Sequence, residues 1–275
     1  MERLEAALEK ARHHRQTAQI AAVADAETVP APAPSPPAPD SWGSLKEVKL
    51  SPRVARNHRI TSMTQGKDSG PYDLLRTRAL KVMGDNDWSS LAITSPNKSC
   101  GKTTVCVNLA FSLARQSDLR IVVLDLDLRR PAMHKILTHR SEHSLHEVLQ
   151  DKHPIETAFV RIGQNLAFGL NNNAASNPSE LLQSKITRTR LAEIKEIFKP
   201  DIMIFDMPPM LVSDENVGFL PFVDAGLLIG AADSTTIAQL DICEKELSEL
   251  TNVLGVVLNK CRFTDNDAGY DYEYY

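Results

Sequence analysis

Lys102 ends a loop-like run in the stretch ITSPNKSCGKTT and is part of a Gly-Lys-Thr triplet. A loop between a strand and a helix points backbone N–H groups and the positive helix end at a bound phosphate. In such a loop Lys102 reaches the β- and γ-phosphates, Thr103 offers its hydroxyl to Mg²⁺, and Thr104 contacts the α-phosphate. The rest of the expected phosphate-binding loop is Asn97, Lys98, Ser99, Cys100 and Gly101.

Pro96 stands where a phosphate-binding loop usually has its first glycine. This proline argues against the loop of an ordinary GTPase or small-molecule kinase, although residues 97–101 can still supply backbone amides. The triplet alone is weak evidence, because it arises by chance in about one chain in ten of this length. The assignment therefore depends on the residues that accompany the loop.

Three aspartates stand at the ends of apolar runs. Asp125 and Asp127 end VVLDLD, and Asp206 ends IMIFD. Ligands of doubly wound sheets bind outside the carboxyl ends of the strands, so these carboxylates are expected beside the loop, where Asp127 and Asp206 can hold Mg²⁺ with Thr103. The alternative is that each aspartate only caps the following helix. Three such residues, each following an apolar run, favour the site.

The elements that must position these residues follow a regular order. Segments long enough for helices, such as 103–116, 180–198 and 235–250, separate most of the short apolar runs. This alternation predicts an α/β fold with a doubly wound, mostly parallel sheet and helices on both faces. The strands are expected at 90–94, 121–126, 165–170, 201–206, 225–230 and 254–259.

Four segments divide the chain of 275 residues. Residues 1–28 are expected to form a helix. Residues 29–43, which begin with the run VPAPAPSPPAPD, are expected to form a proline-rich linker. Residues 44–262 form the predicted nucleotide-binding domain, within which 72–83 reads as an amphipathic helix. Residues 263–275 are expected to be a mobile tail that contains Tyr270, Tyr272, Tyr274 and Tyr275.

Composition excludes several classes of protein. The net charge of −4 gives no reason to expect nucleic acid as the main partner. There is no signal-peptide core and no run of about 18 apolar residues, which predicts a cytoplasmic chain that does not insert into the membrane. The four cysteines are widely spaced, as reduced thiols would be. No histidine pair has ligand spacing, and four histidines are expected on helix surfaces: His134, His139, His143 and His146.

The segments SPNKSCGKTT, VVLDLDLRRP and IMIFDMPP resemble the Walker A, A′ and B motifs of the bacterial tyrosine kinases that govern capsule and exopolysaccharide synthesis. The resemblance extends from about Tyr72 to the C-terminus. Those kinases share their fold with the ParA/MinD ATPases, whose loops carry an early signature lysine. Here that position is Asn97, and Lys98 comes one residue late. An ATP-gated, ParA/MinD-like switch without kinase activity remains the alternative.

The resemblance implies an ATP- and Mg²⁺-dependent tyrosine autokinase whose acceptors are the tail tyrosines. It implies that Lys102 neutralises the γ-phosphate, that Asp125 accepts the tyrosine proton, and that Asn259 recognises adenine. Arg129 either contacts phosphate or braces its own segment. The phosphorylated tail is expected to repel an acidic crevice.

The resemblance also implies partners. These are a membrane-anchored polysaccharide co-polymerase, which recruits the kinase to the inner face of the membrane, and further copies of the chain for phosphorylation in trans. The family's self-association pattern, Glu-x-x-Arg-x-x-Arg, reads Gly70, Asp73 and Arg76 here, so self-association is expected to be weak.

Overall fold

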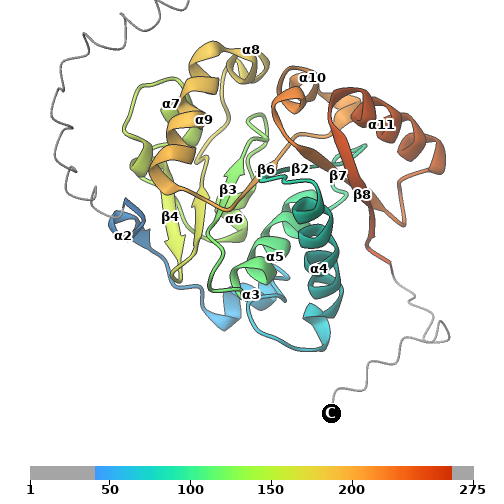
Figure 1. Ribbon diagram of the computed structural model, residues 1–275, viewed down its shortest axis with the longest axis horizontal. Coiled ribbons are helices and arrows are strands. Elements are labelled where there is room, and N and C mark those ends of the chain that lie inside the picture. Colours follow the sequence, from blue (N-terminus) through green and yellow to red (C-terminus); the bar gives the residue numbers. More distant parts are fainter. Residues whose placement is uncertain (1–40, 262–275) are drawn as a thin grey trace, which may run out of the picture. The chain divides into compact units, whose positions relative to one another are not determined.

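The structure is a computed structural model, and it describes residues 41–261 (Figure 1). The predicted N-terminal helix, residues 29–40 of the predicted linker and the predicted tyrosine-rich tail lie outside the described residues. Within them, no helix is long and apolar enough to cross a membrane.

Eight strands of the described chain form one sheet. All neighbouring strands run parallel except β4 and β5, which are antiparallel. The prediction of a mostly parallel sheet is confirmed. Along the sheet, the order is β1 (Lys46–Glu47), β4 (Phe159–Ile162), β5 (Leu166–Gly169), β3 (Ile121–Asp125), β6 (Ile202–Asp206), β2 (Ser90–Thr94), β7 (Ala225–Ala231) and β8 (Asn252–Asn259).

Side chains of the central strands alternate between two apolar layers. On β3, Val122 and Leu124 pack in one layer, and Ile121 and Val123 pack in the other. Because the side-chain period of a strand is two, helices must cover both faces. The first layer is covered by α7 (Leu145–Leu149), α8 (Pro178–Gln183), α9 (Lys185–Phe198), α10 (Glu215–Phe219) and α11 (Ile237–Leu250). The second is covered by α3 (Pro52–Asn57), α4 (Gly70–Asp85), α5 (Lys102–Ala114) and α6 (Met133–Ile136), with α4 beside α5 in Figure 1.

The predicted helix at 180–198 is two helices. Ser184 has an extended backbone (ψ 149°), which ends α8 and begins α9. Its hydroxyl accepts a hydrogen bond from the Thr187 N–H at 3.1 Å, as an N-cap serine does. Two strands had no prediction: β1, which has only two residues, and β4, whose four residues include the charged Arg161 and so form no continuous apolar run.

The folded domain begins before the predicted boundary at residue 44. Helix α2 (Ser41–Ser44) lies partly in the predicted linker, and its Trp42 is buried in the first apolar layer. The Trp42 ring meets Phe198 of α9 edge-on, with ring centroids 6.0 Å apart. Packing of a large aromatic side chain therefore makes residues 41–43 part of the domain.

Helix α4 is tied to α5 through a polar cluster. The Asp73 carboxylate accepts a hydrogen bond from Ser112 Oγ at 2.7 Å and forms ion pairs with Arg76 and Arg115. Arg76 also donates to the Ser112 carbonyl at 3.1 Å. Asp73 and Arg76, two positions of the family's self-association pattern, are thus engaged within the chain.

Candidate nucleotide-binding site

The predicted phosphate loop connects β2, which ends at Thr94, to α5, which begins at Lys102. The strand, loop and helix therefore follow the predicted order. The backbone of Gly101 is left-handed (φ 91°), and that of Ser99 also has positive φ (63°). The Ser95 hydroxyl donates to the Asn97 carbonyl at 2.8 Å and stabilises the start of the loop.

Asn259, at the end of β8, holds the loop from the side. Its side-chain amide donates to the Cys100 carbonyl at 2.9 Å. A Cβ on Gly101 would lie 2.3 Å from Asn259 Nδ2, so only glycine fits beside this hydrogen bond. The adenine contact expected of Asn259 stays a prediction, since this amide contacts the loop.

Lys102 lies between two of the predicted carboxylates. Its Nζ is 2.9 Å from Asp127 Oδ2 and 3.3 Å from Asp206 Oδ1. Burial lowers the pKa of Lys102, but the attraction of Asp206 and Asp127 outweighs burial, and the pKa lies above its ordinary value. The ammonium therefore stays charged and is available to phosphate oxygens.

Asp206 contacts both functional residues at the start of α5. Besides Lys102, its carboxylate accepts a hydrogen bond from Thr103 Oγ1 at 2.6 Å. Burial raises the pKa of Asp206, although Lys102 and the Thr103 hydroxyl lower it. Asp206 is Asp125's partner in the β3–β6 register, which explains how two distant segments bring their carboxylates together.

Asp125 is completely buried behind the others. One of its carboxylate oxygens accepts the Met133 N–H at 3.2 Å, and the other has no hydrogen-bond partner among the described residues. Burial, and then the charge of Asp206, raise the pKa of Asp125 well above its ordinary value. Its role as proton acceptor remains a prediction, and its burial places it further from solvent than Asp127.

A pocket of about 510 Å³ opens at the loop, and we call it the phosphate pocket. Eight of the predicted site residues line it, and a ninth, Asp206, contacts two of these, Lys102 and Thr103. The predicted residues in the lining are Lys98, Ser99, Gly101, Lys102, Thr103, Thr104, Asp127 and Arg129; Asn97, Cys100, Asp125, Asp206 and Asn259 lie outside it. The four predicted acceptor tyrosines lie outside the described residues.

Arg129 is held by Glu215, Asp214 and Ser179, none of which was predicted as a site residue. Its Nε is 2.5 Å from Oε1 of the buried Glu215, and its Nη2 lies 3.4 Å from Asp214 and 3.2 Å from Ser179 Oγ. Of the two roles open to Arg129, these contacts favour bracing. Nothing in the sequence pattern pairs Arg129 with Glu215, because 86 residues separate them.

The donor set suits Mg²⁺ that is shared with a nucleotide. Thr103 and the carboxylates of Asp127 and Asp206 supply the hard oxygen ligands that this ion prefers. Among residues 41–261, no group of three or more His, Cys, Asp or Glu side chains could hold a metal ion by itself. Mg²⁺ commonly takes one or two protein ligands and completes its shell with phosphate and water, so the residues fit it.

Several tyrosine-protein kinases are similar to the chain over much of its length. Tyrosine-protein kinase YwqD of Bacillus subtilis (strain 168) is 27% identical over 227 residues, which cover 81% of the chain and 92% of that protein. Tyrosine-protein kinase etk of Escherichia coli (strain K12) is 30% identical over 188 residues. That match covers 67% of the chain and 25% of the kinase, and the chain spans 24% to 32% of two further relatives.

Solved structures are also similar to the chain. The kinase domain of Escherichia coli tyrosine kinase ETK has a TM-score of 0.67 and 26% identity, with 84% of the chain and 88% of that domain covered. MinD of Pyrococcus horikoshii, complexed with Mg-ADP, has a TM-score of 0.51 and 18% identity over 62% of the chain and 69% of MinD, which shows the fold alone. The family model described as the CobQ/CobB/MinD/ParA nucleotide binding domain matches residues 91–271, and the chain belongs to that family.

Proposed function

We propose that this chain is an ATP-dependent protein-tyrosine kinase that phosphorylates its own C-terminal tyrosines and regulates the synthesis and export of exopolysaccharide or capsule. The observation that carries the proposal is the likeness to a solved tyrosine-kinase domain, which extends over 84% of the chain. Two curated relatives that the chain covers almost completely are also named tyrosine-protein kinases.

ATP is the nucleotide proposed for the phosphate pocket. Lys102 would exchange its contacts with Asp127 and Asp206 for phosphate oxygens, because a triphosphate offers more negative charge than either carboxylate. Thr103, Asp127 and Asp206 would hold Mg²⁺. When bound, the ion neutralises charge on the β- and γ-phosphates.

Proton removal from the acceptor tyrosine is assigned to the A′ aspartates. A general base must come within hydrogen-bond reach of the proton that it accepts. Asp127 lines the phosphate pocket, whereas Asp125 is buried behind it. Asp125 remains the base inferred from the resemblance. On geometry alone Asp127 is the stronger candidate, because it lines the phosphate pocket and Asp125 does not.

The proposed acceptors follow from where the tyrosines stand in the sequence. Of five tyrosines, only Tyr72 falls within residues 41–261. It is half-buried on α4, packs against the second apolar layer, and has its pKa raised by burial. Tyr72 is therefore a poor acceptor, which leaves Tyr270, Tyr272, Tyr274 and Tyr275.

The proposed partner is a membrane-anchored polysaccharide co-polymerase that recruits the kinase from the cytoplasm to the membrane. One solved relative, a chimerical protein named CapA2B2, has a TM-score of 0.67 and 20% identity, which bears on the fold alone. Phosphorylation in trans also requires an encounter between copies of the chain. From Asn259 to Tyr270 is eleven residues, which span at most about 40 Å when extended.

A mixing experiment tests this function. A Lys102→Met protein that keeps its tail is incubated with Mg-ATP and an active protein truncated after Gly269, and phosphotyrosine is mapped by mass spectrometry. Phosphate on the last six residues of the inactive partner is expected. Phosphate on Tyr72 alone, or on no tyrosine, would refute tail phosphorylation and favour the nucleotide-gated switch, for which the MinD-like fold is the supporting observation.

A further inference from the structure

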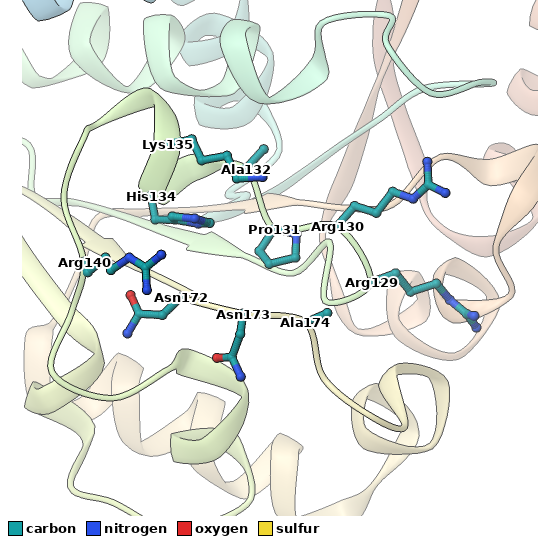
Figure 2. Close-up of a pocket in the computed structure, with 10 residues that line it drawn as sticks. All are labelled: Arg129, Arg130, Pro131, Ala132, His134, Lys135, Arg140, Asn172, Asn173 and Ala174. Carbon is teal, nitrogen blue, oxygen red and sulfur yellow. The ribbon is translucent and has the colours of Figure 1, made fainter.

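A second pocket, of about 490 Å³, adjoins the phosphate pocket, and we call it the basic pocket (Figure 2). It is formed by the segment that follows β3, which includes α6, and by the loop that follows β5. The lining contains no carboxylate. Its five basic side chains are those of Arg129, Arg130, His134, Lys135 and Arg140.

The basic side chains stand at two ends of the basic pocket. In Figure 2, His134, Lys135 and Arg140 gather at one end. Arg129 and Arg130 lie at the other end. Among residues 41–261, the side chains of Arg130, Lys135 and Arg140 have no hydrogen-bond or ion-pair partner. Uncompensated positive charges attract anions. Two separated positive ends therefore suit a ligand that has an anionic group at each end.

The cations at the first end act on His134. Burial lowers the pKa of His134, and the charges of Lys135 and then Arg140 lower it further. A hydrogen bond to the backbone of Asn171 works in the opposite direction. Both cations are therefore close enough to disfavour a proton on the ring. A phosphate group placed among these three side chains would relieve the repulsion.

Two polar atoms in the wall have no hydrogen-bond partner among the described residues. One is Nδ1 of the buried His134, whose ring points towards Pro131 in Figure 2. The other is Asn172 Oδ1, whose side chain is fixed by its Nδ2, which donates to the Ser141 carbonyl at 2.9 Å. Both atoms are covered by their neighbours, so a ligand reaches them after a small rotation of the ring or the amide. Hydroxyl groups both donate and accept, and therefore suit both atoms whichever tautomer His134 adopts.

The volume and the lining together limit the class of ligand. Pockets for organic ligands commonly enclose about 300–1,000 Å³, so the basic pocket is large enough for more than a single phosphate ion. Phosphate groups form strong charge-assisted hydrogen bonds with arginine and lysine. A sugar bisphosphate has a phosphate group at each end and hydroxyl groups between them, which matches the two positive ends and the two free polar atoms.

The position of the basic pocket connects it with nucleotide binding. Arg129, Arg130 and Ala132 line both pockets. The charged lining of the phosphate pocket is itself mostly basic, with Asp127 as its one carboxylate. The expected acidic crevice is therefore not what the structure has. A ligand of the basic pocket and a nucleotide would share the same cations.

We propose that the basic pocket is a regulatory site for a small sugar bisphosphate, and that its occupant weakens nucleotide binding in the phosphate pocket. One phosphate group binds between Lys135 and Arg140, and the other binds Arg130. The hydroxyl groups meet His134 and Asn172. The inference goes beyond the proposed tyrosine kinase and does not depend on it, because it concerns the affinity for nucleotide alone.

The sign of the coupling follows from the shared lining. Arg130 has no partner of its own in residues 41–261, so it can turn to an anion in either pocket. A bisphosphate that engages Arg130 withdraws this cation from the nucleotide and adds a negative charge beside the nucleotide phosphates. Both effects weaken nucleotide binding, and by linkage a bound nucleotide weakens binding of the bisphosphate by the same factor.

Isothermal titration calorimetry of the full chain with fructose 1,6-bisphosphate, without nucleotide, tests the site. The unmodified chain is compared with Lys135→Gln/Arg140→Gln and with a matched control, Lys185→Gln/Lys245→Gln. The control removes the same charge from exposed positions on α9 and α11. The unmodified chain should bind with a Kd below about 1 mM. The first variant should bind about tenfold more weakly, and the control within about twofold of the unmodified chain. Equal affinity of the two variants, or no binding to the unmodified chain, would overturn the proposal.

Three other probes identify what the basic pocket recognises. Fructose 6-phosphate and inorganic phosphate, which each bring one phosphate group, should bind about tenfold more weakly than fructose 1,6-bisphosphate. Hexane-1,6-diyl bisphosphate has two phosphate groups and no hydroxyl group, and should bind about fivefold more weakly, as expected for the loss of one hydrogen bond. Inorganic phosphate that binds as tightly as fructose 1,6-bisphosphate would assign the pocket to a single small anion and overturn the proposed ligand. Equal binding of the two bisphosphates would overturn recognition of the hydroxyl groups.

Titration with ADP in excess Mg²⁺, with and without saturating fructose 1,6-bisphosphate, tests the coupling. The bisphosphate should raise the Kd for ADP about fivefold or more in the unmodified chain and in the control. It should have little effect in Lys135→Gln/Arg140→Gln. The same increase in all three proteins would mean that the bisphosphate competes inside the phosphate pocket, and would overturn a separate site. An unchanged Kd for ADP in the unmodified chain would refute the regulatory role.

Discussion

Replacing Gly101 by alanine introduces two separate problems at the phosphate loop. The left-handed backbone of Gly101 costs an alanine about 1–2 kcal/mol. The new methyl group would also lie 2.3 Å from Asn259 Nδ2, so the amide must move and release the Cys100 carbonyl. A hydrogen bond of this kind contributes about 1 kcal/mol. Alanine also reduces the conformational freedom of the unfolded chain, which stabilises the folded state by about 0.4–1 kcal/mol. The expected net loss is about 2 kcal/mol.

A double-mutant cycle separates the two problems. Asn259→Ala alone should cost about 1 kcal/mol, because it removes only the hydrogen bond to Cys100. The double variant should cost about the same as Gly101→Ala alone, since that hydrogen bond is already lost in the single variant. The two substitutions are therefore expected to be non-additive by about 1 kcal/mol.

Urea unfolding of the nucleotide-free protein measures all three free energies of unfolding. Independent sites add to within about 0.3–0.5 kcal/mol, which sets the threshold for coupling. Additive costs within that range would mean that the alanine methyl does not displace Asn259, and the argument from close approach would then be refuted. A Gly163→Ala variant serves as a control, since Gly163 also has positive φ (66°) but nothing within 4 Å of its added Cβ.

Three further predictions concern the site and the assembly. Lys102→Met should abolish stabilisation by Mg-ATP. The variant should also lower the free energy of unfolding, and by more at pH 7 than near about pH 4. The pKa values of Asp206 and Asp125 are raised in the folded protein, so ionisation of these carboxylates as pH rises destabilises the fold. Loss of the Lys102 cation raises both pKa values further and enlarges this effect. Urea titrations over that range measure this, and a pH-independent loss would contradict it. Asp125→Asn should leave ATP affinity within about tenfold and lower phosphotransfer about 10²-fold or more. Normal transfer would make Asp125 structural, and Asp127→Asn should then show the defect. Self-association should be weak because Asp73 and Arg76 are engaged within the chain; a concentration-independent octamer in light scattering would contradict this.

Strand positions were predictable where a continuous apolar run in the sequence is also buried in the fold. The run SLAIT, expected at 90–94, coincides with β2, and the other long apolar runs match their strands to within a residue or two. β4 was missed because its four residues include the charged Arg161 and form no continuous apolar run; its place in the sheet comes from pairing with β5 on one side and β1 on the other. Its antiparallel direction is likewise a property of the sheet and cannot be read from four residues.

The site was predictable as a set of residues but not as a set of contacts. The loop and the strand-end aspartates come from local motifs, and Lys102, Asp127 and Asp206 are brought together as expected. The burial of Asp125 follows from the β3–β6 register, which sequence spacing does not contain. Two of the four histidines expected on the surface, His134 and His146, are buried. The His146 ring lies with its Nδ1 3.0 Å from Asn171 Oδ1, a contact with a residue 25 positions away that sequence spacing does not show.

The amide of Asn259 gives the chain a mechanical connection that follows from its position. Asn259 is the last residue of β8, two residues before Cys261, where the described chain ends, and it is bonded to the loop beside Gly101. Tension on the C-terminal segment is therefore transmitted to the phosphate loop through a single hydrogen bond. Conversely, a loop that tightens around a nucleotide changes the anchor from which that segment departs. A force applied at the end of β8 and the binding of a nucleotide at the loop are thus mechanically coupled through Asn259.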